Sequence, residues 1–273
     1  MKNFNLPITI KNIYSDILII GLDSTDPAAC RLISELKTSE EYKQKFQFRE
    51  VYFDRMDIEA CSCNYECIRS GGKYCPVRDY RDKLEELILH SEGIIFLFLS
   101  AKPVPPSWEN LVRRFENIRH RPRFFKQKAV LLCNGVIKVR DILSTISAWG
   151  INVYRADKLD RMKKKLHKEY GDSAAGDFVD DFLKHLFDIP PYRPGFMELL
   201  GYQIRKNRVI KDREKIPADY KYWTENNWLE SIYYYPVEPG KWKKKGIDAF
   251  SFILKSINRI QNLKNKKNSG QEE

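Results

Sequence analysis

Four of the six cysteines in this 273-residue chain lie within fifteen positions, a density that suits metal binding. Gly71 and Gly72 allow the chain to turn back inside this segment, so that four thiolates can converge. Four sulfur ligands suit an iron–sulfur cluster or a tetrahedral zinc ion. The spacing equally fits a loop of thiols without metal, and it does not choose among the three. The four are Cys61, Cys63, Cys67 and Cys75, spaced C-x-C-x3-C-x7-C.

The other reactive residue types give weaker signals. The four histidines are scattered, with neither an H-E-x-x-H pair nor the order of a Ser-His-Asp triad, so hydrolase chemistry has no support. We name no catalytic acid or base. Cys30 and Cys133 lie in or beside apolar segments, where we expect small core residues. Residues 113–125 hold five arginines and three phenylalanines. This composition suits contact with nucleic acid or with the phosphates of a nucleotide, but it is more often a surface whose aromatic side chains face the core, which is our interpretation.

A second candidate site lies where polar residues follow predicted strands. Asp23, Ser24 and Thr25 precede a predicted helix, and hydroxyl and backbone N–H groups at a helix start suit a phosphate. The same residues suit an ordinary helix N-cap. The sequence contains neither the dinucleotide fingerprint G-x-G-x-x-G nor the P-loop pattern G-x-x-x-x-G-K-S/T. The loops after the third and fourth predicted strands add Ser100, Ala101, Lys102, Asn134 and Gly135.

Short apolar segments alternate with amphipathic ones over most of the chain. Apolar runs of strand length followed by segments with helical spacing predict a repeated strand–helix unit. Right-handed crossovers then give an α/β fold with a doubly wound parallel sheet. Ligands bind such a sheet at the carboxyl ends of its strands. The predicted strands are 16–21, 46–53, 93–99, 128–133 and 151–154.

A change in composition near residue 189 predicts a domain boundary. The segment IPPYRPG at 189–195 is rich in proline, and the chain beyond it is rich in aromatic residues. Residues 220–235 hold two tryptophans and five tyrosines, too aromatic for a disordered tail. We therefore expect one domain over 1–188 and a partly helical, aromatic C-terminal extension over 189–273 that packs on the domain or on a dimer partner.

The bulk composition bounds the class of protein. Hydrophobic residues make up 42% and charged residues 31%, and the apolar runs are far shorter than the roughly 20 residues of a membrane span. We expect no membrane span and a cytoplasmic location, because no signal-peptide pattern opens the chain. In that reducing compartment clustered cysteines favour metal over disulfides. The net charge of +11 comes largely from local lysine runs typical of solvated surfaces, so nucleic acid is not an expected partner.

The cysteine segment and the strand that follows it carry a resemblance over about residues 14–155. The order of a cysteine loop, the segment CPVRDY at 75–80, a helix and SEGIIF at 91–96 resembles flavodoxin-like NAD(P)H-dependent FMN reductases, especially the iron–sulfur flavoprotein branch. The resemblance implies a five-stranded sheet in the order 2-1-3-4-5 and FMN at the ends of strands one, three and four. It also implies a 4Fe–4S cluster, rather than zinc, on the four cysteines.

The chain departs from the pattern of that family in its phosphate loop. Leu22, Ser24 and the pair Ala28-Ala29 stand where the family has serine, arginine and Asn-Thr. FMN would then depend on backbone donors and on Asp23, Ser24, Thr25, Ser100, Ala101, Lys102, Asn134 and Gly135.

Two functions follow from these observations. The first is an FMN-dependent NAD(P)H oxidoreductase that transfers electrons and works with a nicotinamide nucleotide or protein electron donor, as a homo-oligomer. The second is a flavodoxin-like binding or scaffold protein that has lost the flavin, with a zinc-stapled or metal-free cysteine loop.

Overall fold

The computed structural model describes residues 15–70, 77–100, 102–133, 138–154, 172–190 and 193–269. The chain forms two compact units, one of residues 1–62 with 77–190 and the other of residues 63–76 with 191–273. The predicted domain division between residues 188 and 189 stays a prediction. Residues 63–76, which include part of the cysteine segment, group with the C-terminal unit.

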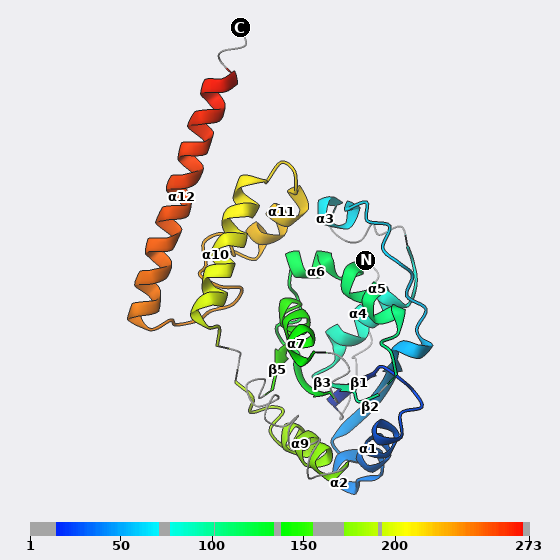
Figure 1. The fold of residues 1–273 in the computed structure, drawn as a ribbon. Helices are drawn as coiled ribbons and strands as arrows, with labels where there is room; N and C mark the ends of the chain where they lie inside the picture. Colours follow the sequence, from blue (N-terminus) through cyan, green and yellow to red (C-terminus); the bar gives the residue numbers. More distant parts are fainter. Residues whose placement is uncertain are drawn as a thin grey trace, which may run out of the picture. The chain divides into compact units, whose positions relative to one another are not determined.

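The first unit is built on a five-stranded parallel sheet in the order β2-β1-β3-β4-β5 (Figure 1). Its register pairs Ile17 of β1 with Phe48 of β2 and with Gly93 of β3. This strand order is the flavodoxin-like one, so the predicted fold class is confirmed. The strands are β1 (Ser15–Gly21), β2 (Phe46–Tyr52), β3 (Gly93–Phe98), β4 (Lys128–Cys133) and β5 (Asn152–Val153).

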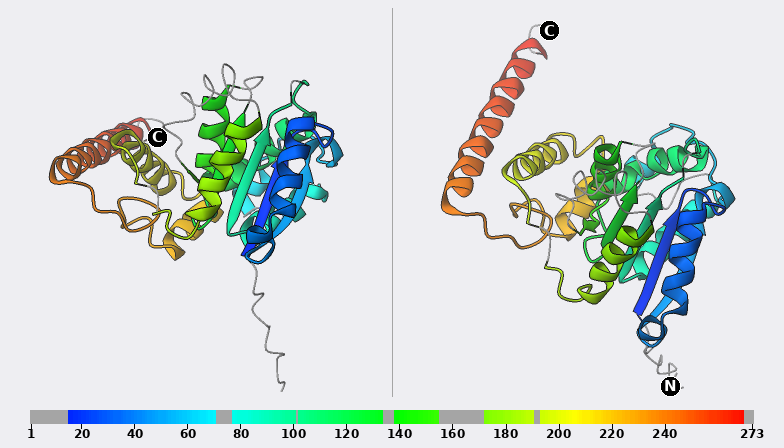
Figure 2. Two further views of the ribbon diagram at one scale, coloured as in Figure 1. Left: turned by 90° about the horizontal axis from the view of Figure 1, so that it is seen from below. Right: turned by 60° about the horizontal axis from the view of Figure 1, so that its bottom comes forward.

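Helices cover both faces of this sheet, which explains why its central strands are apolar throughout. Residues 17–20 of β1 are at most 1% exposed, and every residue of β3 is buried. Helices α1 and α9 lie against each other on one face, and α4, α5 and α7 lie on the other (Figure 1; Figure 2). The helices are α1 (Pro27–Thr38), α2 (Glu40–Lys43), α4 (Tyr80–His90), α5 (Pro106–Arg114), α6 (Glu116–His120), α7 (Val139–Ala148) and α9 (Asp172–Lys184), with the 3-10 turn η1 (Phe53–Arg55).

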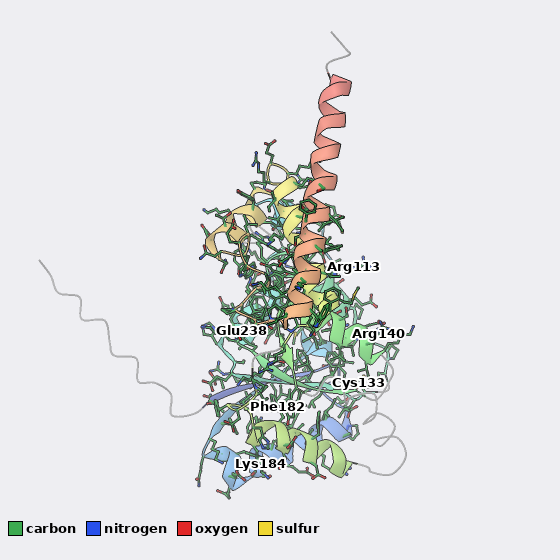
Figure 3. The ribbon with its side chains drawn as sticks, turned by 90° about the vertical axis from the view of Figure 1, so that its left-hand side faces the viewer. Arg113, Cys133, Arg140, Phe182, Lys184 and Glu238 are labelled. Atoms are coloured by element: carbon green, nitrogen blue, oxygen red, sulfur yellow. The ribbon has the colours of Figure 1, made fainter. Side chains whose placement is uncertain are left out.

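The side chains of the first unit follow these layers. Phe182 and Lys184 of α9 lie on one side of the sheet and Arg113 of α5 on the other, with Cys133 at the end of β4 between them (Figure 3). Phe182 is fully buried, whereas Lys184 is half exposed and pairs with Asp180 on the same helix. The amphipathic pattern of α9 therefore matches one buried and one solvated side.

Aromatic side chains fill the space behind the carboxyl ends of the strands. The ring of Trp108 packs edge to face on Phe98 at 5.0 Å and on Phe53 at 5.2 Å between centroids. On its other side it lies 5.9 Å from Trp149, which is 1% exposed. Edge-to-face pairs add to the stability gained from burying each ring. This cluster gives the loops above it a rigid support.

The second unit is helical and its core is aromatic, as predicted for the C-terminal extension. Trp223 is fully buried and stacks on Tyr202 at 5.4 Å between centroids. The Tyr202 hydroxyl donates a 2.5 Å hydrogen bond to the Trp228 carbonyl. Its helices are α3 (Glu66–Ser70), α10 (Phe196–Lys211), α11 (Pro217–Glu225) and α12 (Lys241–Ser269), with α3 against α11 and α10 against α12.

Within the ranges that the structure describes, none of the helices combines the length and the apolar character that crossing a membrane needs.

Candidate functional site

The Asp23 carboxylate is the centre of the loop between β1 and α1. Its Oδ1 atom accepts hydrogen bonds from the Thr25 backbone N–H at 2.9 Å and from the Thr25 hydroxyl at 2.8 Å. Its Oδ2 atom accepts from the Ser100 hydroxyl at 3.1 Å and lies 2.7 Å from Lys102 Nζ. One buried carboxylate thus gathers donors from the loop after β1 and from the loop after β3.

Two further carboxylates receive the other donors of this loop. Asp54 Oδ2 accepts from the Ser24 backbone N–H at 3.0 Å and from the Ser24 hydroxyl at 2.7 Å. Asp26 caps α1 by accepting from the Ala29 N–H at 2.9 Å. Pro27, the first residue of α1, contributes no N–H. The backbone groups that a phosphate-binding helix start would offer therefore bind side chains of this chain instead.

The charges in the loop follow from this arrangement. The hydrogen bond from Lys102 holds the pKa of the Asp23 carboxyl below its ordinary value; burial opposes this shift, and hydrogen bonds from Thr25 and Ser100 add to it. The same contact raises the pKa of Lys102. The Lys102 ammonium also donates to the Thr25 hydroxyl at 2.9 Å. Asp23 is therefore ionised near neutral pH, and Lys102 is the cation that balances it.

The FMN phosphate does not fit this loop as it is arranged. A phosphate dianion would meet the carboxylates of Asp23, Asp26 and Asp54, and Lys102 is already paired with Asp23. The hydrogen-bond donors of Ser24 and Thr25 are also already used by Asp54 and Asp23. Like charges within a few ångströms repel, and the buried Asp23 is only 7% exposed, so water screens it little. The hydroxyls predicted as phosphate ligands serve the protein's own carboxylates.

The structure brings five of the eight predicted cofactor-binding residues together. Their role as flavin ligands stays a prediction, and the three others lie outside the described residues. The five are Asp23, Ser24, Thr25, Ser100 and Lys102; the three are Ala101, Asn134 and Gly135.

Sequence reasoning missed the carboxylates of Asp26 and Asp54. Asp54 follows β2, whose carboxyl end lies beside that of β1 in this strand order, so topology gave a signal for it. Asp26 precedes a proline and two alanines, the usual position of an N-cap.

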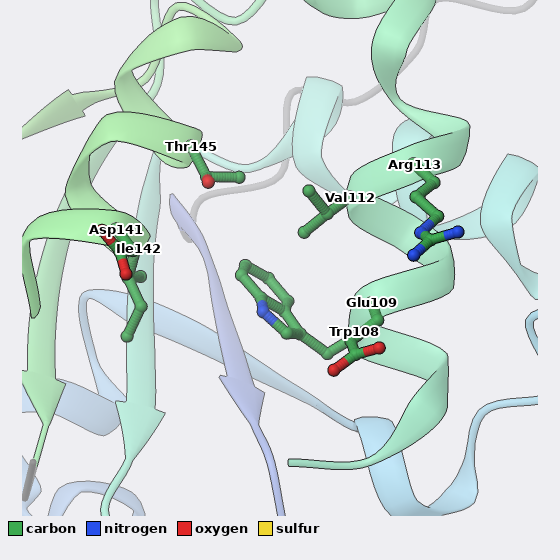
Figure 4. A pocket seen from close by; sticks show the side chains of 7 residues that line it. All are labelled: Trp108, Glu109, Val112, Arg113, Asp141, Ile142 and Thr145. Atoms are coloured by element: carbon green, nitrogen blue, oxygen red, sulfur yellow. The ribbon is translucent and has the colours of Figure 1, made fainter. Parts of the chain in front are cut away.

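A groove opens between α5 and α7. It encloses about 370 Å³ and is lined by Trp108, Glu109, Val112, Arg113, Asp141, Ile142 and Thr145. Trp108 and Val112 point from α5 toward α7, whereas Arg113 lies along the outer side of α5 (Figure 4). Both helices begin after β3 and β4, whose carboxyl ends form the edge where ligands bind in this topology, and the groove extends along the helices from their first turns.

The cysteine segment is divided between the two units. Cys61 belongs to the first, and Cys63 and Cys67 belong to the second. Over the described part of the chain, no three Cys, His, Asp or Glu side chains are arranged to hold a metal ion. Cys75 lies outside the described residues, so the four-cysteine ligand set stays a prediction. The backbone of Cys63 is left-handed, with φ of 54°, which costs about 1 kcal/mol for a residue other than glycine.

The two cysteines outside the cysteine segment, Cys30 and Cys133, differ in burial. Cys133 is buried at 6% exposure, as predicted. Cys30 is exposed on α1, which corrects the expectation of a core residue: it lies on the solvent side of a helix whose buried stripe is formed by Ala29, Leu32, Ile33 and Leu36. The Cys30 thiol lies 3.5 Å from the Ser24 carbonyl, at the edge of the loop.

The basic and aromatic stretch at 113–125 has two of its three phenylalanines in the core. Phe115 and Phe124 are fully buried, which confirms the interpretation for them, and Phe125 is partly buried. Arg114 is also buried, and it pairs with Asp79 and donates to the Val77 carbonyl at 2.9 Å. Asp79 in addition caps α4 through the Arg81 N–H at 2.9 Å.

Comparison of the sequence with protein-family models gives no match, and comparison with the curated proteins gives none either. Among solved structures, the chain is distantly similar to an azoreductase from Bacillus anthracis, with 11% identity, a TM-score of 0.42, and coverage of 62% of this chain and 100% of that one. It is likewise similar to the azoreductase AzrA, at 12% identity and a TM-score of 0.41, over 60% of this chain and all of that one. A flavone reductase follows at 15% identity and a TM-score of 0.39, covering 63% of each chain. These values carry no argument about function, and the fold assignment rests on the strand order itself.

Proposed function

We propose that this chain is a flavodoxin-like binding protein that has lost FMN and holds its phosphate loop closed with its own carboxylate. The observation that carries the proposal is the set of donors around Asp23. Thr25, Ser100 and Lys102 converge on that side chain, as they would on a phosphate, and Lys102 balances its charge.

The proposal follows from a comparison of the two anions. Asp23 is covalently attached, so it occupies the position without the entropy cost of binding, whereas FMN would have to displace it. Displacement would also leave a buried carboxylate without its hydrogen bonds, which costs about 1–3 kcal/mol or more. Asp54 and Asp26 would remain beside the incoming phosphate. The loop therefore discriminates against any phosphorylated ligand.

The ligand that this protein binds is assigned to the groove between α5 and α7. The apolar part of the groove is the half-buried Val112 with Trp108 and Ile142 behind it, which are only 6% and 1% exposed, and Glu109 and Asp141 add two carboxylates. Arg113 also lines the groove, so the carboxylates outnumber the cations (Figure 4). This combination favours a neutral or cationic aromatic molecule over an anionic one, because a cation gains from the carboxylates and a ring packs on the apolar part of the groove.

Riboflavin and FMN test the proposal directly, since they share the isoalloxazine ring and differ by the phosphate. Each is titrated into the full chain while the quenching of flavin fluorescence is followed. The proposal predicts that FMN binds no more tightly than riboflavin. An affinity for FMN about tenfold higher than that for riboflavin, equivalent to about 1.4 kcal/mol, would show that the loop binds the phosphate and would overturn the proposal.

The second candidate is an FMN-dependent NAD(P)H oxidoreductase with an iron–sulfur cluster on Cys61, Cys63, Cys67 and Cys75. The strand order favours it, since the loops after β1 and β3 meet where a flavodoxin-like sheet binds its ligand, and Lys102 lies there. It requires the Asp23 side chain to turn out of the loop. Its electron donor would be a nicotinamide nucleotide or a protein, and its expected assembly is a homo-oligomer.

One anaerobic visible spectrum with iron, sulfide and zinc counts separates the two candidates. Flavin absorbance together with iron and sulfide supports the oxidoreductase. Colourless protein containing zinc or no metal supports the binding protein, since a thiolate loop with zinc serves only to hold the chain.

A further inference from the structure

Helix α12, residues Lys241–Ser269, carries an excess of positive charge. Asp248 is its one acidic residue. A helix with this balance is attracted to polyanions and to anionic lipid surfaces. Its nine basic residues are Lys241, Lys243, Lys244, Lys245, Lys255, Arg259, Lys264, Lys266 and Lys267.

One side of α12 packs on α10 within the second unit. Ile247 is 1% exposed, and Phe250 and Leu254, which follow at helical spacing, are partly buried. The Ser251 hydroxyl donates to Gln203 Oε1 on α10 at 3.2 Å. These contacts account for one apolar stripe of the helix.

A second apolar group lies on another side of α12. Trp242, Phe252 and Ile253 are 86%, 73% and 53% exposed. At about 100° per residue, Trp242, Ala249 and Ile253 fall within one narrow sector, and Phe252 lies roughly 60–100° from them, between Lys241 and Lys245; all four lie away from Ile247. Large side chains exposed at this level on one face of a helix mark a contact surface. The packing of the second unit therefore does not use Trp242, Phe252 and Ile253, which we call the exposed stripe.

We propose that α12 lies flat on an anionic lipid surface, with Trp242, Phe252 and Ile253 in the acyl boundary and the lysines near the start of the helix, such as Lys241 and Lys245, at the headgroups. Apolar insertion and basic charge on a single helix are what binding at such a surface requires. A second copy of α12 would bring another strongly basic helix against the first, and the two would repel. Nucleic acid would use the lysines but would gain nothing from burying Ile253 and Phe252.

Vesicle flotation tests the proposal with the full chain. Vesicles of phosphatidylcholine alone are compared with vesicles that contain phosphatidylserine, at low and at high salt. We expect flotation with the phosphatidylserine vesicles that decreases with added salt, and at least about tenfold weaker binding to phosphatidylcholine, because the charge attraction is screened or absent.

Two variants assign the binding to this helix. The double substitution Phe252→Ser with Ile253→Ser should weaken binding to phosphatidylserine vesicles about tenfold or more, since the inserted apolar area is lost. Phe187→Ser, which removes a ring that is 65% exposed on the first unit, is the matched control and should bind as the wild type does. Circular dichroism should show both variants folded, because all three side chains are exposed.

Three results would overturn the proposal. The first is equal binding to both vesicle compositions, and the second is unchanged binding of the double variant. The third is a wild-type dimer in sedimentation that does not float with vesicles and that the double variant converts to a monomer. That last result would assign the exposed stripe to a second copy of the chain.

Discussion

At the scale of single residues, the Asp23 carboxylate determines how the hydrogen-bond donors of the loop after β1 are used. Sequence alone identified Asp23, Ser24, Thr25, Ser100 and Lys102 as a polar group at the right edge of the sheet, and the structure brings them together. Residue type makes Asp23 the acceptor in this group, because a carboxylate only accepts and the Lys102 ammonium only donates. What the sequence did not indicate is that Asp23, and not a bound phosphate, would take these donors. The acceptor is Asp23, and the loop carries its own anion.

The pH dependence of stability tests this assignment. Hydrogen bonds, above all from Lys102, lower the folded-state pKa of Asp23 below the unfolded value of about 3.9. The stabilisation is therefore complete well above pH 4 and is lost as the pH falls below that value. In urea unfolding near pH 7, Asp23→Ala should lose about 1–3 kcal/mol, because the buried Ser100 hydroxyl and the exposed donors of Thr25 and Lys102 lose a charged acceptor.

The loss caused by Asp23→Ala should shrink as the pH is lowered through about 4. Glu40→Ala, which truncates a carboxylate that is 81% exposed, is the control and should follow the wild type at each pH. A loss for Asp23→Ala that stays constant down to the acid limit of folding would contradict the assignment.

At the scale of secondary-structure elements, the sheet was the most predictable part of the molecule. Strands β1, β3 and β4 are short apolar runs bounded by polar residues, and their burial on both faces explains that pattern. The N-cap at Asp79 was also predictable from residue type. The groove between α5 and α7 was not, because it depends on how two helices from separate parts of the sequence pack together.

Gly93 tests the packing of the central strands. A Cβ at this position would lie 2.9 Å from Ile17 Cδ1 and 3.1 Å from Leu186 Cδ2. We expect Gly93→Ala to destabilise the first unit by about 1–3 kcal/mol, because the added methyl group overpacks the core. The measurement is chemical denaturation.

Gly176→Ala serves as the contrasting variant for Gly93→Ala. Its Cβ would have ordinary contacts at 4.0 Å on helix α9, so this substitution should be neutral or should stabilise by about 1 kcal/mol. Equal effects of the two substitutions would show that the close approach at Gly93 is absent.

At the scale of the whole molecule, the sequence indicated an aromatic C-terminal region but did not indicate which other residues pack with it. Residues 63–76 join the C-terminal unit although more than a hundred residues separate them from it. Neither periodicity nor residue type reports contacts at that sequence distance. The boundary between the two units falls between Ser62 and Cys63, and the ligand set of the four cysteines stays a prediction.

The stability of the second unit should depend on Trp223. This side chain is fully buried between Tyr202, Trp228 and Tyr234, with ring centroids 5.4–5.6 Å away. Trp223→Ala should cost about 3–5 kcal/mol, because a large buried ring is replaced by a cavity. Near-ultraviolet circular dichroism during urea unfolding measures the loss.

Trp242→Ala is the matched control for Trp223→Ala, since the ring of Trp242 is 86% exposed. It should leave the unfolding transition unchanged. A similar loss in the two variants would contradict the aromatic core described for the second unit.

The central claim is that Asp23 stands where a flavin phosphate would bind, and one comparison tests it most directly. The affinities of FMN and riboflavin are measured by fluorescence titration for the wild type, for Asp23→Asn and for the surface control Glu40→Gln. Removing the charge of Asp23 while keeping an acceptor should raise the affinity for FMN relative to riboflavin by about tenfold or more in Asp23→Asn alone. A wild-type chain that already prefers FMN, with a preference that Asp23→Asn leaves unchanged, would contradict the account.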